Sequence, residues 1–405
     1  MSTDNQPELK RILFASYGGG HVHSLVPVIQ KLKEQERFEI EVIGFTTAQA
    51  TFMAAGITAQ SYRCLLQKED EYWLELARQH KPEDNHPTIA AEDSLAYHAL
   101  GLRDLVREQG EEEALRRYQQ EGRKAFLPVD TFSRYLLQTE PDLVVTSTSP
   151  RSELALQYAA NDLNIPGVAI SDLFLQSESR YLCTSRYAPH ITVIAQYVAE
   201  FLQQRGCEAK RLYVLGNPAF DNLADSRYGE QAKALRSELG FEPTERIILW
   251  VCASAAVSMI GKTFVAPDKM LTFLENYCEQ NPGTRYLVRQ HPSNPVVGER
   301  KLRYGVIPTT CILIETCIQL ADIVLQETST VGLQAALVGK PVVTVDAGDY
   351  PPYAQLELAT DVSDLESVAS ALTAANQPNL NRLGYRNLGN AGKTIAQFIT
   401  TLLEE

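Results

Sequence analysis

The stretch RILFASYGGGHVHSLVPVI, residues 11–29, decides the fold. A short apolar run ends in three glycines, and apolar residues at helical spacing follow. This order predicts a buried strand, a glycine turn and a helix. FEIEVIGFT then predicts a second strand, TTAQATFMAAG a helix that ends at Gly56, and ITAQSYRCL a third strand or extended segment. Strands that alternate with helices in this way imply parallel βαβ units.

The same alternation returns later and defines the organisation of the chain. Strand-like runs occur in PDLVVTSTSP, IPGVAISDLF and ITVIA, and again in RIILWVCAS, TRYLVRQHP, ADIVLQE and KPVVTVDA. We therefore expect an α/β fold with two Rossmann-like, doubly wound domains and a cleft between them. We place the N-terminal domain at 1–214, the second domain at 215–380, and a C-terminal helix at 381–405 that packs back on the first domain.

Residues 67–125 interrupt this alternation with a charge-rich, helical pattern. The segment contains QKEDEYWLELARQHKPEDNHP and LRDLVREQGEEEALRRYQQEGRKA, without an internal repeat. Helices of this composition commonly form a solvated domain face. The functional alternative is an insert that shapes the acceptor side of the cleft.

Composition limits the classes of partner. The chain has 405 residues, of which 44% are hydrophobic, so it can bury the cores of two domains. Its 50 acidic and 37 basic residues give a formal net charge of −13. A nucleic-acid-binding protein normally carries a basic face, so nucleic acid is not the expected partner. A few arginines, lysines and helix N-termini can still hold one phosphate group.

The cysteines and the hydropathy pattern bear on the compartment. The chain has seven cysteines and no CxxC pair, which fits neither a zinc site nor a disulfide framework. No stretch approaches the ~18 apolar residues of a membrane span, and no signal-peptide pattern opens the sequence. We expect a cytoplasmic protein with reduced cysteines. A peripheral contact with a membrane surface stays open.

The glycine loop is the first candidate site. Gly19, Gly20 and His21 follow the first strand at its carboxyl end, where open parallel sheets bind ligands. Glycines let a backbone approach a ligand closely, and an imidazole can accept a proton from a hydroxyl group. We assign His21 as the candidate catalytic residue. The structural alternatives are a plain tight turn and a helix-capping histidine.

A second constellation lies in ADIVLQETSTVGLQAALVGKPVV, residues 321–343. A strand delivers Glu327, Thr328, Ser329 and Thr330 to a helix start, where hydroxyls and free N–H groups can bind phosphate oxygens. Ordinary N-capping is the alternative. Gln334 lies further along the helix, where its side chain can reach a ribose.

Two weaker candidates come from the strands RIILWVCAS and TRYLVRQHP. Arg289 is a natural bidentate partner for phosphate, and His291 precedes a proline in an extended segment. His291 also has a structural reading as a hydrogen-bonding histidine. Ser254 belongs to a run of small residues that would let a ligand approach the sheet edge.

These motifs resemble those of known families. GGGHVHSLVPVI is similar to the N-terminal loop of the undecaprenyl-linked N-acetylglucosaminyltransferase and related glycosyltransferases. RLYVLGNPAFDNL and RQHPSNP resemble segments of the non-hydrolysing UDP-N-acetylglucosamine 2-epimerases. ETSTVGLQAALVGKPVV resembles the nucleotide-sugar-binding helix of both groups. The resemblance covers nearly the whole chain except 67–125, and it implies the glycosyltransferase-B (GT-B) architecture.

The resemblance implies a nucleotide-sugar donor in the second domain and an acceptor in the first. The diphosphate would lie near Thr328, Ser329 and Thr330, and the glycosyltransferase histidine matches His21. Gln334 stands where these families commonly carry a ribose-binding glutamate. WVCASAAVSM lacks the histidine and arginines of the epimerases' TxHRRE-like stretch, and YGGGHVH replaces their GTRPE-type loop.

We therefore expect a metal-independent glycosyltransferase without a cofactor, which moves a sugar from a nucleotide sugar to an unknown acceptor: a glycan, a lipid-linked molecule or a small molecule. His21 would act as the general base or orient the acceptor hydroxyl, while Arg289 and the hydroxyl-rich helix start stabilise the departing phosphate. The alternatives are a nucleotide-sugar hydrolase, a 2-epimerase and a non-enzymatic nucleotide-sugar-binding partner subunit.

Overall fold

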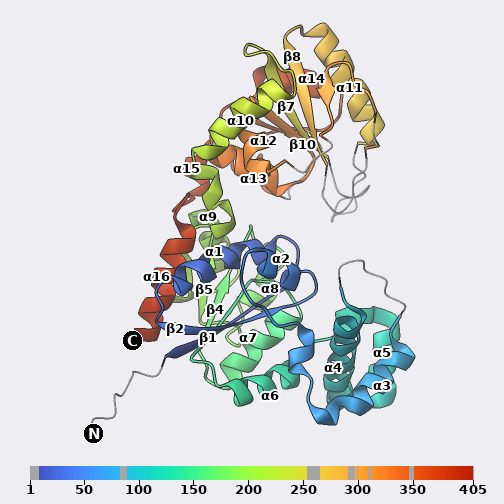
Figure 1. The fold of residues 1–405 in the computed structure, drawn as a ribbon, viewed down its shortest axis with the longest axis vertical. Coiled ribbons are helices and arrows are strands. Elements are labelled where there is room, and N and C mark those ends of the chain that lie inside the picture. The colour runs from blue at the N-terminus through green and yellow to red at the C-terminus, as the bar shows by residue number, and fades with distance from the viewer. Residues whose placement is uncertain are drawn as a thin grey trace. The chain divides into compact units, whose positions relative to one another are not determined.

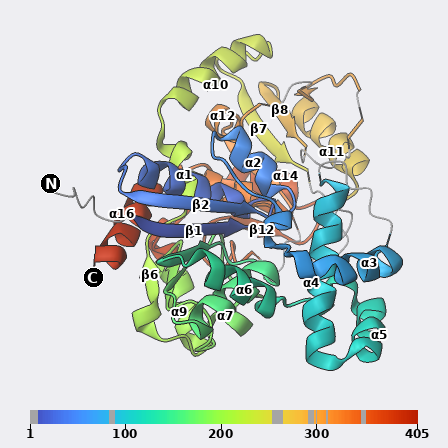
Figure 2. The same cartoon turned by 60° about the horizontal axis from the view of Figure 1, so that its bottom comes forward.

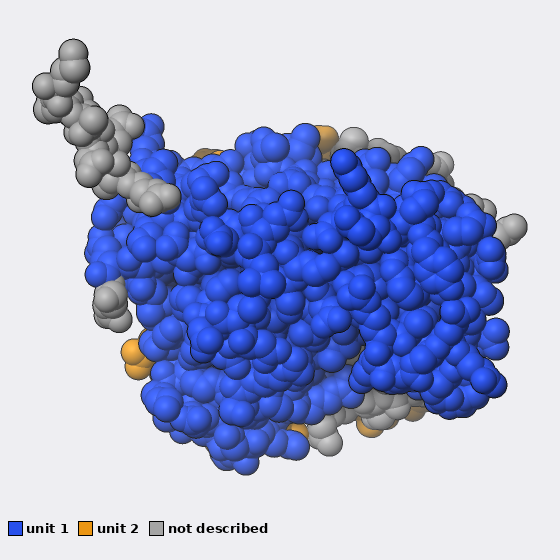
Figure 3. All heavy atoms as spheres, turned by 90° about the horizontal axis from the view of Figure 1, so that it is seen from below, with its two compact units in different colours: residues 1–219, 390–405 blue, residues 220–389 orange. Residues whose placement is uncertain are grey.

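The computed structural model describes residues 9–82, 89–252, 265–290, 297–298, 300–308, 312–345 and 351–404. The chain divides into two compact units. Unit 1 contains residues 1–219 and 390–405, and unit 2 contains residues 220–389, which Figure 3 distinguishes by colour. Each unit is an α/β layer structure with its own sheet, as Figure 1 shows.

Unit 1 is built on a parallel six-stranded sheet of order β2-β1-β3-β4-β5-β6. Its strands are β1 (Lys10–Ser16), β2 (Phe38–Gly44), β3 (Leu143–Thr146), β4 (Gly167–Ile170), β5 (His190–Val193) and β6 (Leu212–Val214). Its helices outside the insert are α1 (His21–Lys33), α2 (Ala48–Ala54), α6 (Val129–Thr139), α7 (Ser152–Asp162), α8 (Ser179–Leu182), α9 (Gln196–Gln204) and α16 (Ala391–Glu404).

Strand β1 is apolar throughout its centre because both of its faces are covered. Ile12 and Phe14 pack into a core with α1, α2 and α16, whereas Leu13 and Ala15 pack into a core with α6 and α7. Figure 2 shows α1 and α2 on one side of β1 and β2, and α6 and α7 on the other. Helix α16 brings the C-terminal end of the chain back onto unit 1, where Ile395 and Ile399 join the α1 core.

The segment 57–65, for which the sequence suggested a third strand or an extended piece, is not a strand of the sheet. Only Gln60 forms an isolated bridge, with Ile43, and the short 3-10 helix η1 (Tyr62–Leu65) follows. The position beside β1 is taken by β3, whose register pairs Ala15 with Thr146. Tyr62 and Leu65 instead pack into the α6 and α7 core.

The helical insert has a small core of its own. It contains η2 (Lys68–Asp70), α3 (Glu71–His80), α4 (Ala91–Gln109), α5 (Glu111–Glu121) and η3 (Gly122–Ala125). Apolar side chains such as Leu102, Leu105, Tyr118 and Phe126 gather between these helices. The charged residues that dominate the sequence of this segment therefore cover a folded subdomain.

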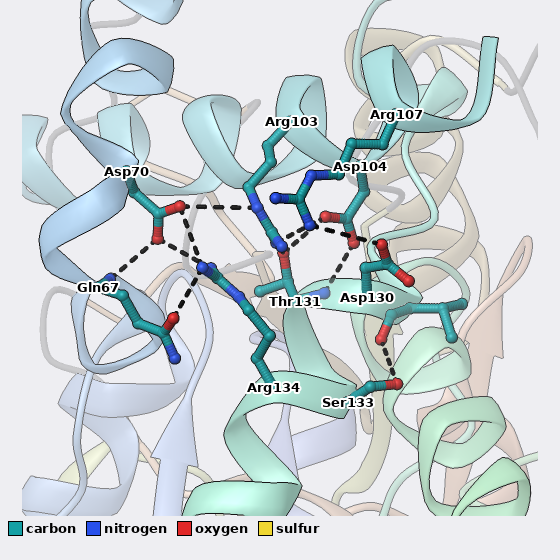
Figure 4. A network of polar contacts seen from close by, with 10 residues as sticks. Gln67, Asp70, Arg103, Asp104, Arg107, Asp130, Thr131, Ser133 and Arg134 are labelled. Carbon is teal, nitrogen blue, oxygen red and sulfur yellow. Dashed lines mark hydrogen bonds and ion pairs between the residues drawn. The ribbon is translucent and has the colours of Figure 1, made fainter.

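A buried polar network joins the insert to α6, as Figure 4 shows. The Arg103 guanidinium is fully buried; its Nη1 donates to Asp104 at 2.9 Å and to Thr131 Oγ1 at 3.0 Å. Arg134 of α6 donates to both carboxylate oxygens of Asp70, at 2.8 and 3.2 Å. Because α6 packs on the sheet, these bonds fix the insert to the sheet of unit 1.

Unit 2 has a second parallel sheet, of order β12-β11-β10-β7-β8-β9. Its strands are β7 (Arg246–Val251), β8 (Thr284–Arg289), β9 (Gly305–Val306), β10 (Ile323–Gln326), β11 (Val342–Val345) and β12 (Thr360–Val362). Its helices are α10 (Arg227–Glu238), α11 (Pro267–Gln280), α12 (Ile314–Leu320), α13 (Thr330–Leu337), α14 (Val368–Ala374) and α15 (Leu380–Leu383), with the 3-10 helix η5 (Pro218–Ala224) at the start. Ile248 and Trp250 of β7 pack against α11 and α14.

Within the described ranges, no helix is both long and apolar enough to cross a membrane.

Candidate functional site

Each sheet has one point where the direction of chain progression reverses. In unit 1 the chain moves from β1 out to β2 and then returns to β3 on the other side of β1. In unit 2 it moves from β7 out to β8 and β9 and then returns to β10. Ligands of open parallel sheets bind beyond the carboxyl ends of the strands at such reversals. The glycine loop follows β1, and the segment 327–330 follows β10, so both predicted motifs lie at these points.

His21 begins α1 directly after the glycine loop, and its imidazole meets an acidic side chain. Its Nδ1 lies 3.1 Å from Oδ2 of Asp172, in the loop after β4. The side chain of Asp172 is 15% exposed and that of His21 30%. The contact is an ion pair rather than a well-aligned hydrogen bond, since Nδ1 makes none by geometry. The pair lies at the carboxyl edge of the sheet, partly open to solvent.

The surroundings of His21 strongly favour its charged form. Burial alone would lower the pKa of His21. The contact with Asp172 and the negative charges of Asp172, Glu153 and Glu178 outweigh burial and raise the pKa to about 9. At pH 7 the neutral fraction is then only about 1%. The general-base role expected from the sequence requires this neutral form, so the structure makes His21 a strong base that is mostly protonated at neutral pH.

Glu153 holds the glycine loop in place through hydrogen bonds of its carboxylate. It is fully buried in the first turn of α7, and Oε1 accepts the backbone N–H of Tyr17 at 2.5 Å. Oε2 accepts the Ser147 hydroxyl at 2.6 Å and the Ser149 N–H at 2.9 Å. Burial raises the pKa of Glu153, while the charge of His21 and these donors oppose the rise. One carboxylate thus ties the loops after β1 and β3 together.

The three glycines of the loop differ in why the structure requires a residue without a side chain at each position. Gly18 lies against the loop after β2, because a Cβ at this position would come within 1.8 Å of Thr47 Oγ1. Gly19 has a φ of 75°, which residues with a side chain rarely adopt. Gly20 has neither constraint: its φ is −67°, and the nearest atom to a Cβ would be Asp172 Oδ2, at 4.0 Å. Gly19 and Gly20 are exposed, which leaves their backbone accessible to a ligand.

Asn217 links three parts of the site in unit 1. Its Oδ1 accepts the Ser24 hydroxyl of α1 at 3.0 Å and the N–H of Ala219 at 2.9 Å. Its Nδ2 donates to the carbonyl oxygen of Asp172 at 2.8 Å. Asn217 therefore fixes the loop that carries Asp172 relative to the helix that carries His21.

In unit 2, the hydroxyl residues begin α13 after β10. Ser329 is the N-cap of α13, and its hydroxyl accepts the N–H of Val331 at 3.2 Å. The carbonyl of Ser329 accepts the Tyr353 hydroxyl at 2.7 Å and the amide of Gln326 at 3.3 Å. The capping alternative therefore accounts for the Ser329 side chain. Thr328 is half-buried and Thr330 is exposed.

Three side-chain oxygens near the start of α13 are buried without a hydrogen-bond partner in the described part of the chain. They belong to Gln326, Glu327 and Gln334. Glu327 is 2% exposed, and burial raises its pKa to about 7. Buried acceptors normally have donors, so these oxygens are available to hydroxyl or N–H groups of a ligand or to ordered water. A ribose diol is one such donor for Gln334.

The remaining predicted residues are less informative. Arg289 ends β8, pairs in register with Val251 of β7 and is half-buried. Ser254 and His291 lie outside the described residues. Across the described ranges, no three His, Cys, Asp or Glu side chains gather as a metal-binding group.

Sequence reasoning missed three of the residues that organise the site in unit 1. Asp172 lies two residues after β4 and Asn217 three residues after β6, whereas Glu153 lies in the first turn of α7, the helix that follows β3. That position was a usable signal, because parallel strands bring their carboxyl ends to one edge. Which of these side chains turns toward His21 depends on loop conformation, which the sequence does not reveal.

Comparisons with known proteins establish the fold. No family model and no curated protein sequence matches the chain. Among solved structures, UDP-GlcNAc 2-epimerase from Neisseria meningitidis bound to UDP-GlcNAc is 14% identical, with a TM-score of 0.59 over 98% of this chain and 100% of that chain. UDP-GlcNAc 2-epimerase from Methanocaldococcus jannaschii is 13% identical, with a TM-score of 0.60 over 96% and 99%.

A glycosyltransferase shares the same fold. The calicheamicin glycosyltransferase is 13% identical, with a TM-score of 0.57 over 98% of this chain and 99% of that chain. UDP-GlcNAc 2-epimerases from several organisms therefore share this fold with a glycosyltransferase. The expected α/β class with two Rossmann-like sheets of GT-B type is therefore confirmed, and at these identities the similarity concerns the fold alone.

Proposed function

We propose that the protein is an enzyme that acts on a nucleotide-activated sugar and transfers the sugar to an acceptor hydroxyl. The observation that carries this proposal is the pair of His21 and Asp172, placed beside a glycine loop at the reversal point of the first sheet. A carboxylate beside an imidazole stabilises the imidazolium that forms when the histidine takes a proton. Deprotonation of an acceptor hydroxyl needs such a base.

The donor would bind in unit 2. The backbone N–H groups at the start of α13, the hydroxyls of Thr328 and Thr330, and Arg289 would hold the diphosphate, with Ser329 keeping the helix start in shape. Gln334 would accept a hydrogen bond from the ribose. This set supplies positive potential where the leaving group gains negative charge, without requiring a metal ion or cofactor.

The chemistry of transfer balances with these groups. The acceptor oxygen forms a bond to the anomeric carbon, and the bond from that carbon to the phosphate oxygen breaks, with its electron pair leaving on the nucleoside diphosphate. The acceptor proton passes to His21, and Asp172 stabilises the resulting charge. Because the pKa of His21 is about 9, activity through this base should rise with pH up to that value.

Epimerisation at the sugar is the second candidate, and the fold comparisons favour it because several of the similar structures are UDP-GlcNAc 2-epimerases. Against it stands the sequence of the chain itself, where WVCASAAVSM and YGGGHVH replace two epimerase motifs. Hydrolysis would use the same donor half with water as the acceptor.

Product analysis separates these reactions. The full-length protein is incubated with UDP-GlcNAc and with other nucleotide sugars, with and without candidate acceptors, and the products are followed by NMR. Release of nucleotide that depends on an acceptor supports transfer. A new nucleotide sugar without acceptor identifies an epimerase, and free sugar without acceptor identifies a hydrolase. Nucleotide binding without any turnover would instead identify a binding subunit.

A further inference from the structure

The chain passes from unit 1 to unit 2 inside a helix. The 3-10 helix η5 runs from Pro218 to Ala224, and the boundary between the units lies within it, between Ala219 and Phe220. On the unit 2 side of this boundary, Phe220 and Leu223 are buried. Because a rigid element carries a displacement from one of its ends to the other, a shift of the unit 2 end of η5 reaches its unit 1 end.

Asn217 joins the unit 1 end of η5 to the two segments that carry the ion pair. Its Oδ1 accepts the N–H of Ala219, in the first turn of η5, at 2.9 Å and the Ser24 hydroxyl at 3.0 Å. Its Nδ2 donates to the carbonyl oxygen of Asp172 at 2.8 Å. Asn217 is 1% exposed, so these bonds form away from water, where they are stronger. One amide group thus bonds η5, the helix that begins with His21 and the loop that contains Asp172.

The unit 2 end of η5 packs against the second passage of the chain between the units, at residues 389 and 390. A Cβ at Gly389 would lie only 2.7 Å from the Cβ of Ala224, the last residue of η5. The backbone of Gly389 therefore packs directly on Ala224, and a methyl group here would push the end of η5 away. The packing within unit 2 thus sets the position of this end of η5.

We propose that Asn217 is a positioning residue that couples η5 to the pair of His21 and Asp172, so that a structural change in unit 2 alters the base in unit 1. Asn217 takes no part in proton transfer; it acts on the distance between imidazole and carboxylate, which is 3.1 Å. The inference rests on the proposed function for the word base alone, because the coupling itself concerns the structure of the protein. In the proposed reaction it would tie the base to the state of the unit that holds the donor.

The test follows the His21 imidazole in the full-length protein by NMR titration, with His21→Gln to assign its signal. The pKa of about 9 depends on the contact with Asp172 and on the charges of Asp172, Glu153 and Glu178. A longer distance from His21 to Asp172 therefore changes this titration, whereas a general loss of stability with the pair intact does not.

Three variants separate the bridge from other asparagine contacts. In Asn217→Ser, the hydroxyl can still accept the N–H two residues along the chain, but it is too short to bond Ser24 and Asp172. Ser24→Ala removes only the bond from α1. Asn161→Ala is the matched control, because Asn161 also bridges two segments of unit 1, by donating to the carbonyl oxygens of residues 185 and 186 at 3.2 and 3.0 Å.

The imidazole and the carboxylate should separate in Asn217→Ser and, to a smaller extent, in Ser24→Ala. At pH 9 the protonated fraction of His21 should fall from about one half in the wild type to about one tenth in Asn217→Ser. Asn161→Ala should titrate like the wild type. An unchanged His21 titration in both bridge variants would overturn the proposal, and Ser24→Ala decides alone if Asn217→Ser does not fold.

A substitution in unit 2 tests the coupling from the other end. Gly389→Ala places a methyl group against Ala224, whereas Gly283→Ala, the control, meets no other part of the chain within 4 Å. The two glycines have φ values of 84° and 86°, so the variants share the same backbone strain. We expect only Gly389→Ala to change the His21 titration, and the change to vanish when Asn217→Ser is also present. The same titration in both glycine variants, or a change that persists without Asn217, would contradict the coupling.

A nucleotide titration of the same proteins separates this inference from the proposed function. If no nucleotide binds while Gly389→Ala changes the His21 titration through Asn217, the coupling stands and the nucleotide-sugar function fails. If a nucleotide binds while every variant titrates like the wild type, the proposed function stands and the coupling is overturned.

Discussion

His21 Nδ1 and Asp172 Oδ2 lie 3.1 Å apart, although one residue follows β1 and the other follows β4. Strand β3 separates these two strands in the sheet, so the loops must reach across it. Asn217 holds the two loops together: its Nδ2 donates a hydrogen bond to the Asp172 carbonyl, and its Oδ1 accepts one from the Ser24 hydroxyl of α1. The pair is therefore a product of tertiary structure rather than of local sequence.

Replacement of Asp172 by Asn should lower the pKa of His21. The variant loses the negative charge that stabilises the imidazolium, while burial still favours the neutral imidazole. If His21 is the base, the rise of kcat/KM with pH should move to lower pH, and maximal activity should fall because the base is weaker. The Glu178→Gln variant is the control, since Glu178 raises the pKa of His21 least among the named carboxylates. Histidine NMR titration measures the pKa directly; an unchanged pKa in Asp172→Asn would contradict the pairing.

Gly18→Ala should destabilise unit 1, whereas Gly20→Ala should not. A Cβ at Gly18 would meet Thr47 Oγ1 at 1.8 Å, so the loops after β1 and β2 must separate, at a cost of about 1–3 kcal/mol. A Cβ at Gly20 has its nearest neighbour at 4.0 Å, and the φ of Gly20 suits alanine. Chemical denaturation of both variants checks this difference. Equal stability of the two variants would show that the loops do not touch in this way.

Arg103→Ala should destabilise the attachment of the insert far more than Arg107→Ala, although the two residues lie one helical turn apart. Arg103 is fully buried between Asp70, Asp104 and Thr131, and loss of one partner from a buried charged network costs about 3–5 kcal/mol.

The side chain of Arg107 is 52% exposed and lies 3.8 Å from Asp130, so its loss should stay within about 0.5 kcal/mol. Hydrogen exchange of the insert and of α6 reads out both changes. Similar protection in the two variants would contradict the role given to the network in Figure 4.

Arg151→Gly should be more stable than Arg151→Ala. Both variants lose the guanidinium, but only glycine adopts a φ of 71° with a ψ of −104° without strain. Alanine at this position would carry backbone strain of about 1–3 kcal/mol, whereas glycine loses about 0.5–1 kcal/mol more conformational entropy on folding. The relief of strain exceeds the entropy cost, so the glycine variant should be the more stable one. Thermal unfolding of the two variants compares them directly. A less stable glycine variant would show that this backbone conformation carries no strain.

Much of the fold could be predicted because its signals are local. The apolar run of β1 followed by glycines and by the α1 pattern indicates a βα unit whatever lies elsewhere in the chain. The segment 57–65 was harder, because its composition suits both a strand and a 3-10 helix. In the structure only Gln60 bridges the edge strand β2, at Ile43, before the 3-10 helix η1 begins. The interpretation of the insert as helical holds because charge-rich segments with helical spacing rarely form anything else.

The site was less predictable than the fold. His21 was visible because it directly follows the glycines, and the segment 327–330 because hydroxyl residues precede a helix. Asp172 and Glu153 act through contacts between loops, so their roles need the three-dimensional arrangement. The raised pKa of His21 likewise comes from acidic residues distant in sequence.

The central claim is that the protein binds a nucleotide-activated sugar, and a thermal-shift titration tests it most directly. The full-length protein is titrated with UDP-, GDP-, CMP-, CDP- and dTDP-sugars and the matching free nucleotides. A ligand at 100 times its dissociation constant stabilises the folded state by about 2.7 kcal/mol, which a shift in Tm reveals readily. We predict a clear shift with one nucleotide class, which Gln334→Ala reduces. No shift with any member of the panel would contradict the claim.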